Sequence, residues 1–161
     1  MKKALKIVTL ILAVCMTATF MFGCAMFGAI DPKDAKKNLK DAGYEVMLID
    51  DEEDIEMMGK EFDGAEAVIS AFDRDEYVYA VLFEEKADAK DFFEDRKEEF
   101  EDEIKDLEDA IEEAYDNDED DYAKDLEDEL EEMKENQIKR LGKWVVMASS
   151  KDALNAFKKG K

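Results

Sequence analysis

One group of acidic residues has the spacing of a metal site. Positions 1, 3, 5 and 12 of a twelve-residue calcium-binding loop would be held by Asp116, Asp118, Asp120 and Glu127. Two further positions depart from that pattern, because Asp121 stands where the sharp turn needs glycine and the cation Lys124 stands at position 9. Acids fill 26 of the 48 positions in residues 88–135, so this spacing also arises by chance. The four carboxylates are therefore candidate Ca²⁺ ligands, and loose divalent-cation binding by the whole acidic stretch is the alternative.

Residues with the usual catalytic roles are scarce. The sequence has no histidine, which removes the usual general base and the commonest transition-metal ligand. It has no glycine-rich phosphate loop and no serine elbow, and most of its carboxylates lie in charged stretches where a solvated helix face is expected. We expect a protein that is not an enzyme and has no cofactor. The exception would be a carboxylate-based hydrolase whose residues only the fold brings together.

The N-terminal segment has the layout of an export signal. Three lysines in the first six residues precede a run, residues 7–30, that is 24 residues long and uncharged. Residues 21–24, Met-Phe-Gly-Cys, resemble the lipobox of a bacterial lipoprotein signal, in which a small residue precedes a lipidated cysteine. The resemblance implies removal of residues 1–23, acylation of Cys24 with palmitate-like chains, and residues 24–30 as a tether. The alternative is an uncleaved N-terminal transmembrane anchor, for which the run is long enough.

Both alternatives put the remaining chain on the extracytoplasmic face of the cell membrane. Three of the 23 Lys and Arg residues belong to the signal, so the mature chain carries 45 acids against 20 bases, a net charge of -25. Such a chain is not expected to bind nucleic acid, because phosphate contacts need Lys and Arg. Residues 25–30, which follow the lipidated cysteine, reach only about 20 Å even when extended, so the domain must lie close to the lipid.

Hydrophobic patterning predicts a single α+β domain over residues 31–161. The expected elements are a helix over 31–43, a strand over 44–50, a short helix over 52–61, strands over 66–72 and 76–84, a helical hairpin over 88–140, a strand over 143–149 and a closing helix capped by 149–152. The sheet would have about four strands, mostly antiparallel, and the long acidic antiparallel hairpin would be inserted before the last strand. A straight helix that swaps the last strand into a second copy is the alternative, so the oligomeric state stays open.

The hairpin is predicted from an apolar seam with coiled-coil spacing. The seam residues before the turn are Phe93, Phe100, Ile104, Leu107, Ile111 and Ala114, and those after it are Tyr122, Leu126, Leu130, Met133 and Ile138. The chain is expected to turn at residues 116–121, where Asp and Asn favour the end of a helix. Both faces of strand 76–84 are apolar, so the face away from the core needs either helical cover, which we favour, or a partner.

Charge distribution suggests the function. Basic residues flank the acidic hairpin, with Lys33, Lys36, Lys37 and Lys40 in the first helix and three more lysines at the C-terminus. These lysines either form a solvated helix face or contact anionic lipid. We expect a membrane-anchored interaction or structural module of the cell envelope, whose acidic arm or sheet face binds a basic envelope protein. The alternative is a protein that responds to Ca²⁺ or Mg²⁺ through residues 116–127.

Overall fold

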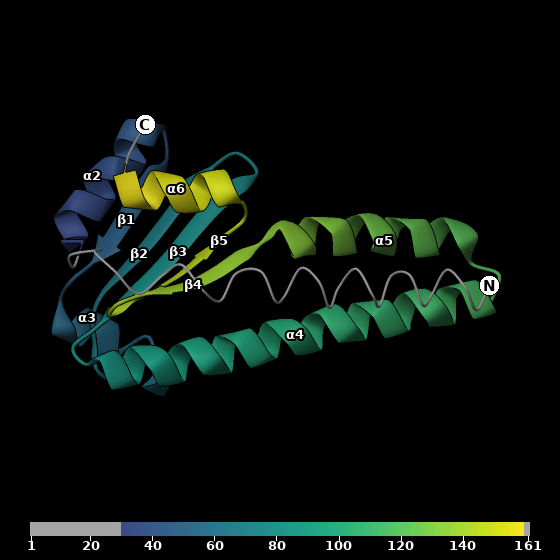
Figure 1. Ribbon diagram of the computed structural model, residues 1–161, viewed down its shortest axis with the longest axis horizontal. Coiled ribbons are helices and arrows are strands. Elements are labelled where there is room, and N and C mark those ends of the chain that lie inside the picture. The colour runs from purple at the N-terminus through teal and green to yellow at the C-terminus, as the bar shows by residue number, and fades with distance from the viewer. Residues whose placement is uncertain (1–29, 160–161) are drawn as a thin grey trace.

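The computed structural model describes residues 30–159. Cys24, the predicted signal segment and tether residues 24–29 lie outside the described residues. In chain order the elements are α2 (Pro32–Ala42), β1 (Glu45–Ile49), α3 (Glu52–Glu56), the 3₁₀ turn η1 (Lys60–Phe62), β2 (Ala65–Asp73), β3 (Glu76–Phe83), α4 (Lys86–Asp116), α5 (Asp120–Glu135), β4 (Gln137–Leu141), β5 (Trp144–Ala148) and α6 (Lys151–Lys159), as Figure 1 shows. The predicted α+β class is confirmed.

The sheet has five strands in the order β1-β2-β3-β5-β4, and every neighbouring pair is antiparallel. The expectation of about four strands missed β4. The sequence predicts residues 137–140 as part of the helical hairpin, but α5 ends at Glu135 and Ile138 pairs with Met147 of β5. A tight turn at Gly142, whose φ of 72° suits glycine, joins β4 to β5. The helical hairpin is therefore inserted before the last two strands.

Helices α2 and α6 cover one face of the sheet. The Asp31 carboxylate accepts the Lys33 N–H over 2.8 Å at the start of α2, and Gly43 ends that helix with a φ of 106°. Ser150 precedes α6 and caps it, because its Oγ accepts the Ala153 N–H over 3.0 Å. The core on this face holds Leu39, Tyr44, Ile69, Val78, Trp144, Leu154 and Phe157. The caps of α2 and the buried stripe match the predictions. The closing helix is capped one residue later than the box at 149–152 predicts, because the Ser149 Oγ instead accepts the Tyr77 N–H over 3.0 Å.

The opposite face is covered by α3, η1 and the first turns of α4. Phe92 of α4 packs between Phe62 and Phe83, with ring centroids 6.0 and 5.2 Å away. Cover is incomplete over the middle of β1 and the last residues of β2, where Met47 is 57 % exposed and Phe72 is 59 % exposed. The predicted helical cover is present, but it leaves part of an apolar sheet face in water.

Helices α4 and α5 form the predicted antiparallel hairpin and project beyond the sheet (Figure 1). Only residues 117–119 connect them, and Asp118 adopts the left-handed conformation with a φ of 60°. The buried seam in α5 begins one residue later than predicted, because Ala123 is fully buried whereas Tyr122 is 55 % exposed. An ion pair of 3.0 Å between Lys134 and Glu108 links the two helices.

Tyr44 should make the fold sensitive to high pH. Its side chain is buried and its hydroxyl donates a 2.8 Å hydrogen bond to Glu76, so burial first, and then this bond and nearby carboxylates, raise its pKa. Because the pKa of Tyr44 is higher in the folded state, the free energy of unfolding is unaffected below the unfolded pKa near 10. Above that pH it falls, by up to about 1.4 kcal/mol per pH unit.

We therefore expect the free energy of unfolding to fall from pH 10 upward, and Tyr44→Phe to make that fall shallower. Urea denaturation at a series of pH values measures both. Tyr122→Phe, the same change at an exposed position, is the matched control. An unchanged slope in Tyr44→Phe would contradict the assignment.

Candidate interaction surfaces

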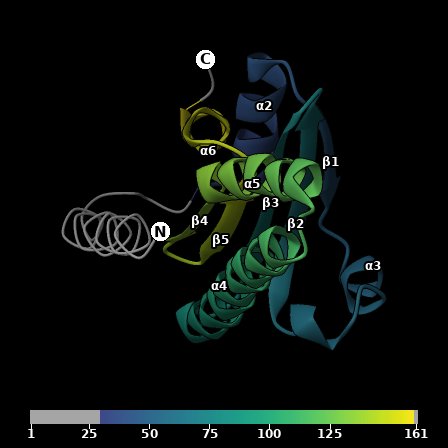
Figure 2. The same ribbon diagram turned by 90° about the vertical axis from the view of Figure 1, so that its right-hand side faces the viewer.

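Helices α2 and α6 bring two distant lysine groups together. The helices pack side by side, and the Asn38 side-chain amide donates to the Phe157 carbonyl over 3.3 Å. The described part of these two helices has six lysines and three aspartates. We call the six lysines the lysine layer: Lys33, Lys36, Lys37, Lys40, Lys151 and Lys158. In Figure 2 helices α2 and α6 lie on one side of the sheet and α4 on the other. The fold has thus gathered a basic surface on an acidic protein.

The chain enters the domain on the side of the lysine layer. The Trp144 indole N–H donates to the Ile30 carbonyl over 2.8 Å, and the Ile30 side chain packs against the core beneath α2 and α6. A tether that ends at residue 30 therefore joins the domain next to its basic surface.

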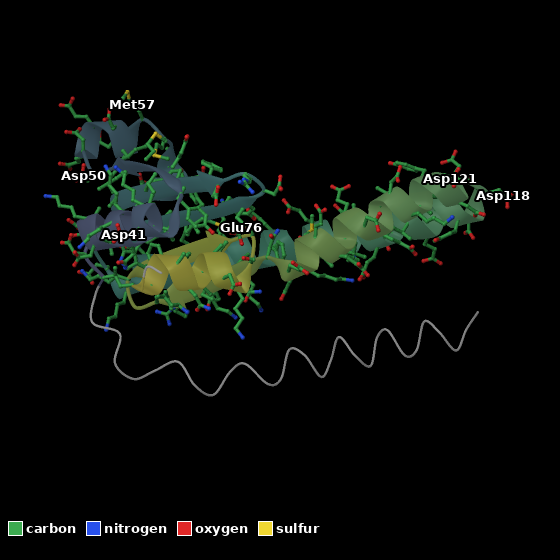
Figure 3. The ribbon with its side chains drawn as sticks, turned by 90° about the horizontal axis from the view of Figure 1, so that it is seen from above. Asp41, Asp50, Met57, Glu76, Asp118 and Asp121 are labelled. Carbon is green, nitrogen blue, oxygen red and sulfur yellow. The ribbon has the colours of Figure 1, made fainter. Side chains whose placement is uncertain are left out.

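The acidic surface is the arm, which we define as α4, α5 and their connection, residues 86–135. It carries 26 acids against 7 bases, a net charge of -19. Three ion pairs lie along α4 itself, and like-charged neighbours at helical spacing remain over most of its length. The acids extend to the tip, where Figure 3 labels Asp118 and Asp121.

The structure does not gather the four candidate Ca²⁺ ligands. Asp116 ends α4, Asp118 lies in the connection and Asp120 begins α5. Glu127 lies inside α5, about 10 Å along the helix from Asp120, and accepts the Tyr115 hydroxyl over 3.1 Å. Within residues 30–159, no group of three or more acidic or cysteine side chains is arranged to hold a metal ion. The calcium loop fails for a physical reason: nine of its twelve residues are helical, so its ligands cannot converge.

A calcium titration should reflect this geometry. We expect calorimetry to give a weak binding heat that disappears at physiological salt. Dispersed carboxylates attract Ca²⁺ only by non-specific electrostatics, which salt screens. Asp116→Asn combined with Asp118→Asn should behave like the unchanged protein. Saturable micromolar binding with one ion per chain would contradict this account and restore the calcium-responsive alternative.

A cavity of about 200 Å³ lies where the arm meets the sheet. Its apolar lining comes from five different elements, each giving one half-buried residue: Tyr77, Phe100, Met133, Ile138 and Met147. We call this cavity the notch. The sequence analysis missed it, since Phe100, Met133 and Ile138 were all assigned to one helical seam. The two helices are unequal, 31 against 16 residues, which leaves half of α4 to pack on something other than α5. The predicted hairpin over 88–140 hid this inequality, because it extended the second helix through β4.

The charged residues of the notch are unevenly paired. Arg96 is shared between Glu61 at 2.9 Å and Glu99 at 3.0 Å, and its guanidinium lies 5.2 Å from the centre of the Phe92 ring. Glu103 has no ion-pair partner in residues 30–159, although it lines the same cavity. Burial and then the Glu103 carboxylate raise the pKa of Tyr77. The notch thus combines an apolar floor with an unmatched negative charge.

Fold and surfaces together define an α+β domain with a basic helical layer on one side and an acidic projecting arm. Comparisons with protein-family models, curated proteins and solved structures find no match for this chain. No helix within residues 30–159 combines the length and the apolar character needed to span a bilayer.

Proposed function

We propose that this protein is a membrane-anchored, extracytoplasmic interaction module without catalytic activity. In this proposal the lysine layer faces anionic lipid and the arm binds a basic protein of the cell envelope. The observation that carries the proposal is the separation of charge: six described lysines gather beside the chain entry at Ile30, whereas the arm carries a net charge of -19.

The distance between the lysine layer and α4 is large enough to orient the domain at an anionic membrane. Each lysine near an anionic surface contributes about 1 kcal/mol of binding free energy. The sheet lies between the lysine layer and α4, and packed layers are about 10 Å apart, further than the screening length of about 8 Å. Lipid that attracts the lysines therefore repels the arm only weakly and leaves it accessible from outside.

The density of acids on the arm supports a basic partner. Like charges at helical spacing oppose helix formation, so solubility alone would be served by fewer of them. Complementary charge raises the association rate and disfavours acidic competitors. Lipidation at Cys24, which the lipobox resemblance implies, would hold this surface at the membrane.

Binding of a basic probe tests the proposal. The full-length protein in discs of neutral lipid is titrated with a fluorescent twelve-residue lysine peptide at rising salt. Removing four arm charges with Glu112→Gln, Glu113→Gln, Asp128→Asn and Glu129→Gln should weaken binding by about fivefold or more. The same number of changes in α3, at Glu52, Glu53, Asp54 and Glu56, is the matched control. Equal losses in the two variants, or no binding at all, would contradict the proposal.

A further inference from the structure

We propose that the notch is the docking site for one segment of that partner, a basic segment that carries a large apolar side chain. The apolar side chain fills the cavity, and a neighbouring lysine or arginine pairs with Glu103. This inference rests on the proposed function, which requires a basic partner but does not say where it is held.

The apolar half of the site is already assembled. Five half-buried side chains line the cavity, and an apolar cavity of about 150 Å³ is enough to hold benzene, so about 200 Å³ accommodates an aromatic or branched side chain. The apolar surface also continues beyond the notch. Phe72 is the cross-strand neighbour of Tyr77, and both lie on the sheet face that α4 covers only in part. A bound segment could therefore extend from the notch across β3 onto β2.

The charged half of the site selects a cation. Arg96 already has two carboxylate partners, whereas Glu103 has none in the described part of the chain. Glu103 is exposed at the rim of the cavity, so an incoming ammonium or guanidinium group can pair with its carboxylate while a neighbouring apolar side chain fills the notch. Large apolar side chains that anchor an interface surrounded by charged contacts are the usual arrangement of a binding hot spot.

The same charges disfavour two other occupants. A second copy of this chain would bring another strongly acidic arm to the notch, and like charges oppose that approach. An anionic lipid surface would meet Glu99 and Glu103 on the arm, on the sheet face away from the lysine layer. A basic protein segment satisfies both the cavity and the carboxylate.

Two peptide probes separate notch binding from general attraction to the arm. Each is a fluorescent ten-residue lysine peptide, with phenylalanine at one central position in the first and alanine there in the second. With the unchanged full-length protein in neutral discs, we expect the phenylalanine peptide to bind about tenfold more tightly. Met133→Trp, which fills the cavity, should remove that preference without changing any charge.

Two charge variants complete the test. Glu103→Gln should weaken binding of the phenylalanine peptide by about fivefold. The matched control Glu98→Gln makes the same change on the same helix outside the notch and should alter affinity by less than about twofold. Equal binding of the two peptides, or equal effects of the two variants, would overturn the notch and leave the proposed function standing. No binding of either peptide would overturn both. Self-association of the chain that Met133→Trp abolishes would overturn the inference in favour of a second copy.

Discussion

Trp144→Ala is expected to lower the free energy of unfolding by about 3–5 kcal/mol, the largest loss from any single substitution considered for this chain. The Trp144 side chain is only 1 % exposed, and its ring meets Phe157 edge to face, 5.2 Å away and at 76°. Its indole N–H also holds the Ile30 carbonyl. One substitution therefore opens a cavity between β5 and α6 and releases the Ile30 carbonyl.

Urea denaturation followed by circular dichroism measures this loss. Trp144→Phe keeps an aromatic ring but removes the N–H donor, so we expect a smaller loss of about 1–2 kcal/mol. Tyr122→Ala, which truncates a large side chain on the exposed arm, should change stability by less than about 0.5 kcal/mol. A loss below about 1 kcal/mol for Trp144→Ala would show that this side chain is not part of the core.

Replacing Lys33, Lys36, Lys37 and Lys40 with glutamine is expected to abolish binding to anionic vesicles. At about 1 kcal/mol for each lysine, the four changes remove about 4 kcal/mol, which is close to a thousandfold in affinity. The experiment uses protein that begins at residue 30, which keeps the Ile30 contacts with the core but leaves no acyl chain and no apolar run to mask the electrostatic contribution.

Co-sedimentation with vesicles rich in phosphatidylserine at low salt measures this effect. The matched control replaces four lysines of α4 with glutamine, at Lys86, Lys90, Lys97 and Lys105. These four lie on the other side of the sheet, so vesicle binding should be retained. Equal losses in the two variants would mean that net charge, and not the lysine layer, governs attraction to the membrane.

The elements with local signals were predicted well. Asp31-Pro32 and Gly43 bound the first helix as expected, because capping and left-handed backbone depend on residues next to one another. The hairpin of β2 and β3 followed from alternating apolar residues around a polar link. The doubling back of the arm followed from geometry, since a straight helix could not return the chain to the sheet.

The elements that depend on tertiary packing were predicted less well. Ile138 fits either a helical seam or an alternating strand, and only its pairing with Met147 decides between them. The same ambiguity hid the notch, which needs residues from β3, α4, α5, β4 and β5 in one place. The calcium loop illustrates the reverse error. Four acids had suitable spacing, but helix formation from Asp120 onward holds them apart.

The lysine layer could be predicted only in part. The sequence showed basic residues at both ends of an acidic domain, but not that α2 and α6 pack together on one side of the sheet. That packing turns two dispersed groups into one surface and makes the orientation at a membrane testable.

The most direct test of the central claim measures that orientation. The protein, anchored as proposed on anionic bilayers, carries a spin label at Lys37→Cys on α2 or at Asp118→Cys at the arm tip. Relaxation by a lipid-bound nickel reagent reports proximity to the headgroups. We expect strong relaxation at residue 37 and none above the level of soluble reagent at residue 118. Equal relaxation at the two positions, as for an arm lying flat on the bilayer, would contradict the proposed module.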